Sequence, residues 1–335
     1  MSSKSSSRRE FLLTSFTMTS AALLWHPVFA ASTKQPLAAT TKQPVQFHGW
    51  DAFHHIRDKA VANGWCTLPI GELVGNIANE FLGAPYKAHT LELSTDREIC
   101  SVDVTAFDCV TFFETSLAFA RMLKKGGLSP KSLLDEIAFI RYRGGKPGDY
   151  STRLHYTTDW FADNETKHVV KVLSELPGSK TITHRVGYMS AHPQESPQLV
   201  ANPSLIPKIK SSEDAINKRS MKFVPMDKIA AIEPQLKTGD IVAICTRRRG
   251  LDVVHTGLVM RTADGVAHFM DASSKKNKMK VVLEAGPISQ TLKWSKPNTG
   301  SKHKTGSKHN NGSKYNNGSP YDTGAIFARP LEPLV

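Results

Sequence analysis

Apolar residues in the first half of the chain recur at helical spacing. The positions Phe53, Ile56 and Ala60 predict a helix that begins at about Asp51, and a second helix is predicted over residues 70–81. Three further helices are predicted over residues 109–121, 130–139 and 167–176.

The second half of the chain alternates between apolar and polar residues, which is the spacing of strands. Asp264-Gly265 favours a tight hairpin turn, and residues 91–104 favour an extended chain. Strands are predicted over residues 241–246, 253–260, 266–272, 280–283 and 324–330. Helices followed by antiparallel strands indicate an α+β fold, with helices packed on one face of a single antiparallel sheet.

The N-terminal segment has the order of regions found in an export signal. Arg8-Arg9 stand ahead of Phe11-Leu12-Leu13, an apolar stretch follows to Leu24, and Val28-Phe29-Ala30 fits a small-residue cleavage site. The paired arginines resemble the twin-arginine export signal. We therefore expect residues 1–30 to be a signal peptide and the mature protein to be periplasmic or secreted.

Polar and low-complexity segments divide the rest of the chain. Residues 31–50 are expected to be a flexible tether, and residues 51–335 a single domain. Within this domain, residues 177–230 are expected to form an irregular excursion over the surface. Residues 296–323 contain a six-residue repeat rich in Gly, Ser, Lys and His, which predicts a loop inserted before the last strand.

The net charge of the chain indicates which classes of molecule the protein could bind. Its 335 residues include 43 Lys and Arg against 30 Asp and Glu, a formal net charge of +13. Such a balance favours anionic partners: nucleic acid, acidic lipid or cell-wall polymers. Export disfavours nucleic acid, and no basic amphipathic helix supports a lipid-binding surface. No segment is apolar and long enough to span a bilayer, and no required protein partner is evident.

Four cysteines follow the signal: Cys66, Cys100, Cys109 and Cys245. Cys66 and Cys100 lie in loop-like sequence and could pair in an oxidising compartment, whereas Cys245 has the position of a packed strand residue. Neither a Cys-x-x-Cys nor a His-Glu-x-x-His spacing occurs, so we expect no zinc or other metal and no organic cofactor.

Cys109 has the sequence surroundings of a nucleophile. Asp108 is a suitable N-cap, so Cys109 falls in the first turn of a predicted helix. Unpaired backbone N–H groups and the positive end of the helix dipole favour thiolate over thiol there, and the thiolate is the nucleophile. The alternative is a buried cysteine that packs as a small hydrophobic residue.

A cysteine nucleophile needs a base and a polar group that orients the base. His255, in the middle of a predicted strand and followed by Thr256-Gly257, is the candidate base; otherwise it is a satisfied core histidine. On the next strand, His268 and Asp271 face opposite sides, so only one of them can orient His255. We choose Asp271, because a carboxylate at a strand end avoids deep burial, and keep His268 as the alternative.

Several ordered motifs resemble the NlpC-type superfamily of papain-like cell-wall hydrolases. They are Leu82-Gly83-Ala84-Pro85-Tyr86, Phe107-Asp108-Cys109-Val110, Gly239-Asp240-Ile241-Val242-Ala243 and His255-Thr256-Gly257-Leu258. The chain resembles more closely the N-acetylmuramoyl-L-alanine amidase-like branch, through Ile140-Arg141-Tyr142-Arg143, Arg153-Leu154-His155-Tyr156, Asp159-Trp160 and Gly250-Leu251-Asp252-Val253. The resemblance covers most of residues 70–330. It implies a papain-like fold with a large insertion between the cysteine helix and the histidine strand.

The same resemblance implies a reaction. It is hydrolysis of the amide between the lactyl group of muramic acid and L-Ala of the peptidoglycan stem, and the branch is associated with anhydromuramoyl ends. Cys109 would be the nucleophile and His255 the base, while Tyr86 and Asp108 would line the site. Where many relatives have His-Ala-Ser, this chain has Asp271-Ala272-Ser273. The chain therefore departs from the family pattern at the residue that would orient the base.

A polar and aromatic stretch after residue 140 supplies the expected substrate contacts, although it could also be a solvated loop. The candidate contacts are Arg141, Arg143, Arg153, His155, Tyr156 and Trp160. Two rival functions remain open. One is a cysteine endopeptidase that cuts the stem peptide between D-Glu and the diamino acid, and the other is a non-catalytic wall-binding protein.

Overall fold

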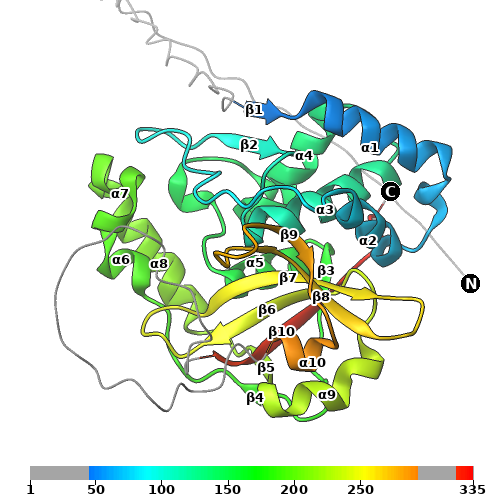
Figure 1. Ribbon diagram of the computed structural model, residues 1–335. Helices are drawn as coiled ribbons and strands as arrows, with labels where there is room; N and C mark the ends of the chain where they lie inside the picture. The colour runs from blue at the N-terminus through cyan, green and yellow to red at the C-terminus, as the bar shows by residue number, and fades with distance from the viewer. Residues whose placement is uncertain (1–44, 293–321, 335) are drawn as a thin grey trace, which may run out of the picture. The chain divides into compact units, whose positions relative to one another are not determined.

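The computed structural model describes residues 45–292 and 322–334, which belong to one compact unit (Figure 1). The export signal predicted over residues 1–30 lies outside the described residues. So do most of the tether over residues 31–50 and nearly all of the loop over residues 296–323. Within the described ranges, no helix has the length and apolar character needed to cross a membrane.

An antiparallel sheet forms the centre of the fold. Its strands follow the order β4-β5-β10-β6-β7-β8-β9, and β3 also pairs with β10. They are β3 (Val170–Val172), β4 (Lys180–Thr181), β5 (Lys222–Pro225), β6 (Ile241–Thr246), β7 (Val253–Arg261), β8 (Ala267–Ser273), β9 (Lys280–Leu283) and β10 (Asp322–Pro330). The five strands predicted in the second half are confirmed, and the last of them pairs with β6 in the middle of the sheet.

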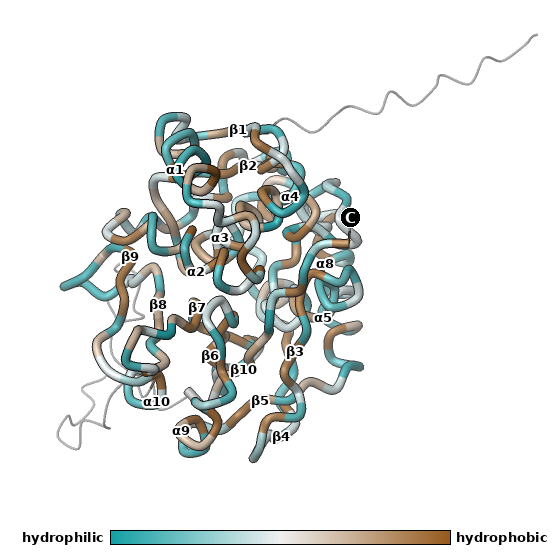
Figure 2. The backbone as a smooth tube through the Cα atoms, turned by 90° about the vertical axis from the view of Figure 1, so that its right-hand side faces the viewer, coloured by the Kyte–Doolittle hydropathy of each residue, from teal (hydrophilic) through white to brown (hydrophobic). Residues whose placement is uncertain are grey.

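Helices cover both faces of this sheet, which corrects the expectation of helices on one face. α9 (Ile229–Ile232) and α10 (Ile288–Thr291) lie on the side opposite to the N-terminal helices (Figure 2). Ile229 and Ile288 share a hydrophobic cluster with Val242 of β6. Every residue of β6 is buried, and neighbouring residues of a strand face opposite sides, so this strand needs cover on both.

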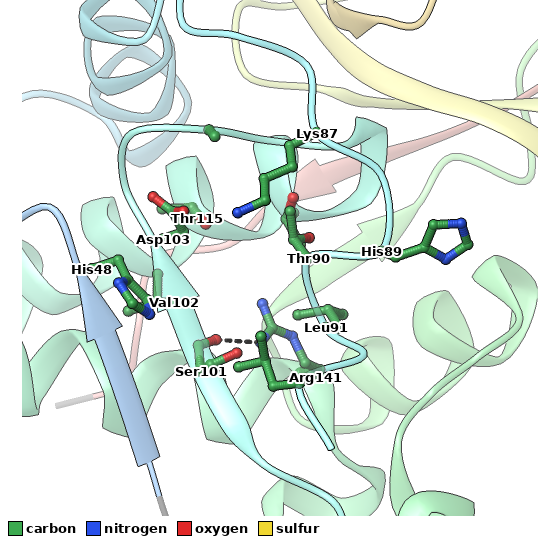
Figure 3. Close-up of a pocket in the computed structure, with 13 residues that line it drawn as sticks. His48, Lys87, His89, Thr90, Leu91, Ser101, Val102, Asp103, Thr115 and Arg141 are labelled. Carbon is green, nitrogen blue, oxygen red and sulfur yellow. Dashed lines mark hydrogen bonds between the residues drawn. The ribbon is translucent and has the colours of Figure 1, made fainter. Parts of the chain in front are cut away.

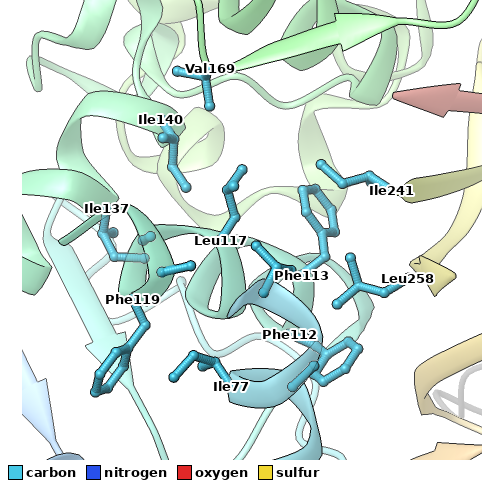
Figure 4. Packing of buried hydrophobic residues seen from close by; sticks show 14 of the residues in the cluster. Ile77, Phe112, Phe113, Leu117, Phe119, Ile137, Ile140, Val169, Ile241 and Leu258 are labelled. Carbon is cyan, nitrogen blue, oxygen red and sulfur yellow. The ribbon is translucent and has the colours of Figure 1, made fainter. Parts of the chain in front are cut away.

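The N-terminal helices form the layer that carries Cys109. They are α1 (Trp50–Ala62), α2 (Ile70–Glu80), α3 (Cys109–Lys124) and α4 (Pro130–Arg141), and each confirms a predicted helix. α3 lies at the centre of the layer, because residues 111–123 are buried on all sides. Phe113 and Leu117 of α3 share one hydrophobic cluster with Ile241 and Leu258 of the sheet (Figure 4).

The extended chain predicted over residues 91–104 is a strand only at its end. There β2 (Cys100–Asp103) pairs in parallel with β1 (Val45–His48), outside the central sheet. The prediction of a helix over residues 167–176 is wrong. α5 (Thr157–Thr166) ends before it, since His168 adopts a left-handed backbone with φ 55° and the valines of β3 pair with β10.

The excursion predicted over residues 177–230 is more regular than expected. β4 and β5 extend the sheet, and the segment also forms α6 (Tyr188–Ala191), α7 (Pro197–Ala201) and α8 (Ile206–Ile216). Glu213 of α8 is fully buried and accepts hydrogen bonds from the Tyr156 hydroxyl at 2.8 Å and from the backbone N–H of Ser190 at 3.0 Å. These bonds tie the inserted helices to the segment before α5.

The disulfide considered between Cys66 and Cys100 is not formed, because all four cysteines are free thiols. Cys100 is buried in β2, and burial raises its pKa to about 11, so the thiol stays protonated. Cys245 is buried in β6, as predicted. The described residues contain no group of three His, Cys, Asp or Glu side chains that could hold a metal ion.

Candidate active site

Cys109 occupies the first position of α3, and Asp108 caps the helix. The Asp108 carboxylate accepts hydrogen bonds from the backbone N–H groups of Val110 at 3.0 Å and Thr111 at 2.7 Å. In return, the Thr111 hydroxyl accepts the backbone N–H of Asp108 at 2.9 Å. This reciprocal cap fixes the start of the helix, and the partly exposed Cys109 thiol lies at its positive end.

Two neighbouring strands bring a histidine and a carboxylate to Cys109. The Thr256 hydroxyl of β7 donates to the backbone carbonyl of Cys109 at 2.8 Å, which holds the strand against the start of α3. His255 contacts the Cys109 side chain, and its Nε2 donates to Asp271 Oδ2 of β8 at 2.7 Å. The structure therefore brings Cys109, His255 and Asp271 together.

The imidazole of His255 is held in its charged form. Burial would lower its pKa, but the charge of Cys109 and the hydrogen bonds to Asp271 and Cys109 outweigh burial and raise the pKa to about 10. Only 11% of the side chain is exposed, so solvent screens these charges weakly. At neutral pH the His255 imidazole is therefore protonated, with Cys109 on one side and Asp271 on the other.

Tyr86 lies close to Cys109, whereas His268 bonds a different part of the chain. Tyr86 forms a β-bridge with Phe107, two residues before Cys109. Burial, followed by the charges of Cys109 and Asp108, raises the pKa of Tyr86, so its hydroxyl remains a hydrogen-bond donor. His268 instead places Nδ1 at 3.1 Å from the backbone carbonyl of Glu284.

Two of the predicted substrate contacts, Arg141 and Trp160, lie in the interior behind α3. Both bind Glu114 of that helix: Arg141 Nε donates to Oε2 at 2.8 Å, and Trp160 Nε1 donates to Oε1 at 2.9 Å. These three residues are no more than 2% exposed. A direct contact of Trp160 with substrate would require this core to open, whereas Arg141 also lines a cavity (Figure 3).

The other predicted contacts share a small cavity of about 10 Å³ next to the inserted helices. They are Arg143, Arg153, His155 and Tyr156. Each has internal partners: Arg153 forms an ion pair with Glu98 at 3.2 Å, and His155 Nε2 lies 2.7 Å from the backbone carbonyl of Tyr150. Burial, followed by the charge of Arg153, lowers the pKa of His155 to about 3, so this histidine is neutral.

We expect Glu114→Gln to destabilise the protein strongly, because it leaves the buried Arg141 guanidinium without a countercharge. Removing one partner of a buried ion pair costs roughly 3–5 kcal/mol. The free energy of unfolding in urea measures the loss. The matched control is Asp135→Asn, which breaks an exposed ion pair with Lys131 and should change the free energy of unfolding little. Equal losses in the two variants would contradict the assigned role of Glu114.

One protein family and several solved structures are similar to this chain. The family model described as N-acetylmuramoyl-L-alanine amidase-like matches residues 76–294. A crystal structure of an N-acetylmuramoyl-L-alanine amidase from Bacteroides uniformis is similar at a TM-score of 0.65 and 30% identity, covering 78% of this chain and 98% of that one. A putative xylanase from Bacteroides fragilis is similar at a TM-score of 0.61 and 28% identity, covering 76% and 98%. No curated protein matches the chain.

Proposed function

Because the chain belongs to the N-acetylmuramoyl-L-alanine amidase-like family, we propose that it is an exported cysteine amidase with a papain-like, NlpC-type fold. It hydrolyses the amide between the lactyl group of muramic acid and L-Ala in muropeptides, anhydromuramoyl ends included. The observation that carries the proposal is the contact of His255 with both Cys109 and Asp271 at the start of α3. Arg8-Arg9 supports export by the twin-arginine route.

Acylation begins when the Cys109 thiolate attacks the lactyl carbonyl carbon. The carbonyl oxygen becomes negative, and its proposed hydrogen-bond donors are the backbone N–H of Cys109 and the hydroxyl of Tyr86. The His255 imidazolium then gives its proton to the L-Ala nitrogen, and the carbon–nitrogen bond breaks. The products of this step are neutral His255, a thioester on Cys109 and a free stem peptide.

Deacylation restores the starting state. Neutral His255 takes a proton from water, and the water oxygen attacks the thioester carbonyl. The carbon–sulfur bond breaks, the Cys109 thiolate returns, and the lactyl carboxylic acid leaves with the sugar. Asp271 accepts the His255 Nε2–H and keeps the imidazole oriented throughout.

This mechanism predicts that kcat/KM falls at alkaline pH with a midpoint near 10, where His255 loses the proton needed by the leaving amine. The raised pKa of His255 also increases the free energy of unfolding. This contribution is complete below the unfolded-state pKa of about 6.5 and is lost as the pH rises through 10. Initial rates between pH 6 and 11 measure the profile, and recovery of activity at pH 7.5 controls for unfolding. An alkaline midpoint near 7 would contradict the assignment.

Mass spectrometry of muropeptides tests the proposed function. The mature protein and its Cys109→Ala variant are each incubated with muropeptides that include anhydromuramoyl forms. We expect free stem peptide beginning with L-Ala from the wild type and none from the variant. Disaccharide-dipeptide products would instead identify an endopeptidase that uses the same nucleophile. Retained wall binding without cleavage by the wild type would overturn the enzyme assignment.

A further inference from the structure

Lys280 is the first residue of β9, the strand next to β8 (Figure 1). It pairs with Ser273 of β8, which lies two residues beyond Asp271. Opposite residues of an antiparallel pair share a face, and so do residues two apart in a strand, so Lys280 and Asp271 lie on one face of the sheet. Diagonal neighbours of this kind lie roughly 7–8 Å apart, which brings Lys280 close to the carboxylate that binds His255.

A second segment holds the backbone of Lys280 from the other side. Pro85 forms a β-bridge with Lys280, and the backbone N–H of Tyr86 donates to the carbonyl of Met279 at 2.9 Å. Met279 has a left-handed backbone with φ 47°, so the chain turns sharply just before β9. Lys280 is therefore fixed between two segments that each contribute a residue to the proposed active site.

The charges around Lys280 leave its ammonium group available to an anion from outside. In the turn before β9, Lys275 and Lys278 both form ion pairs with Glu284, at 3.5 and 2.5 Å. That carboxylate is therefore already used. Lys280 is exposed, and no carboxylate in the described part of the chain forms an ion pair with it.

The turn between β6 and β7 adds positive charge at the same end of the sheet. β7 begins at Val253, next to His255, and β8 ends at Ser273, so the β6–β7 turn and the β8–β9 turn both lie at the end that carries the catalytic histidine. Arg247 and Arg249 in the first of these turns are exposed. Positive charge gathered at one end of the sheet favours an anionic substrate there.

The stem peptide carries an anion at a matching distance from the amide that is cut. In the proposed reaction His255 protonates the L-Ala nitrogen, so the peptide leaves from the histidine side of the site. D-Glu follows L-Ala and is joined to the next residue through its side-chain carboxyl group, which leaves its α-carboxylate free. That carboxylate lies within two residues of the leaving nitrogen, at most roughly 7 Å away. The long and flexible lysine side chain can span the remaining distance.

We propose that Lys280 binds the α-carboxylate of D-Glu, so that the enzyme prefers stem peptides with a free carboxylate to stems in which this group is a carboxamide. The inference rests on the proposed amidase function. An exposed ion pair of this kind supports a preference of about fivefold. Because the bond that breaks is the same in both substrates, the preference should appear mainly in KM, and it should weaken at high salt.

The test uses two muramoyl stem peptides that differ only at D-Glu, whose α-carboxyl group is free in one and a carboxamide in the other. We expect the wild-type kcat/KM to be about fivefold higher on the free carboxylate. This ratio should fall to about one in Lys280→Gln and below one in Lys280→Glu, whose charge repels the carboxylate, while Lys280→Arg should keep it. The matched control is Lys131→Gln, which removes an exposed lysine of α4 and should keep the wild-type ratio.

Equal wild-type cleavage of both substrates would overturn the inference while leaving the amidase proposal intact. A wild-type preference that survived unchanged in Lys280→Gln would also overturn it. Failure of the wild type to cut the lactyl amide in either substrate would instead overturn the proposed function. Because Lys280 is exposed, the melting temperatures of its variants should stay close to the wild-type value, which controls for unfolding.

Discussion

The Cys109→Ala variant is expected to release stem peptide from muropeptides at least about 10⁴-fold more slowly than the wild type. The loss is this large because the thioester cannot form without the Cys109 sulfur. Quantified release of stem peptide over time measures the effect. Cys109→Ser should be impaired almost as severely, because a serine hydroxyl is not ionised by a neighbouring imidazolium.

A matched control for this prediction is Cys66→Ser. Cys66 is a second partly exposed free thiol, and it lies in the turn after α1. We expect this variant to keep the activity of the wild type. A Cys109→Ala variant that kept a tenth of the wild-type rate would contradict the role of Cys109 as the nucleophile.

Asp271→Asn is expected to lower kcat/KM by about 10²–10⁴-fold. Asn keeps the shape of the side chain but removes the buried negative charge that accepts the His255 Nε2–H at 2.7 Å. The imidazolium is then less stable, so the alkaline midpoint of the pH profile should also move below 10. Rate profiles of the variant and the wild type between pH 6 and 11 measure both effects.

The matched control here is His268→Asn, on the same strand. His268 bonds the backbone carbonyl of Glu284 rather than His255, so its replacement should leave kcat/KM near the wild-type value. A large loss in His268→Asn together with an active Asp271→Asn would show that the orienting residue was assigned wrongly.

The parts of the site that lie within a few residues of each other could be predicted from the sequence. The N-cap at Asp108 and the position of Cys109 in the first turn follow from local residue preferences, and the reciprocal cap with Thr111 bears out that reasoning. Because neighbouring residues of a strand face opposite sides, the sequence predicted that only one of His268 and Asp271 could orient His255. The structure places Asp271, not His268, against His255. The reason given for that choice was wrong, because Asp271 is fully buried.

The parts that depend on distant contacts could not be predicted. Arg141 and Trp160 look like ligand-binding residues in the sequence, yet Glu114 of α3 binds both in the interior. The valines near residue 170 fit a helical spacing as well as a strand, and only pairing with β10 decides between them. The cavity beside α3 combines residues from several separate segments, so no single stretch of sequence indicates it.

The most direct test of the central claim is peptide mapping by mass spectrometry after rapid acid quench of the wild-type protein with a muramoyl-peptide substrate. Acid quench preserves a thioester, so the acylated peptide can be identified and weighed. We predict a transient adduct on Cys109 whose mass equals the muramoyl-lactyl acyl group without any amino acid. Continued turnover with no adduct on Cys109, or with an adduct on another residue, would contradict the account.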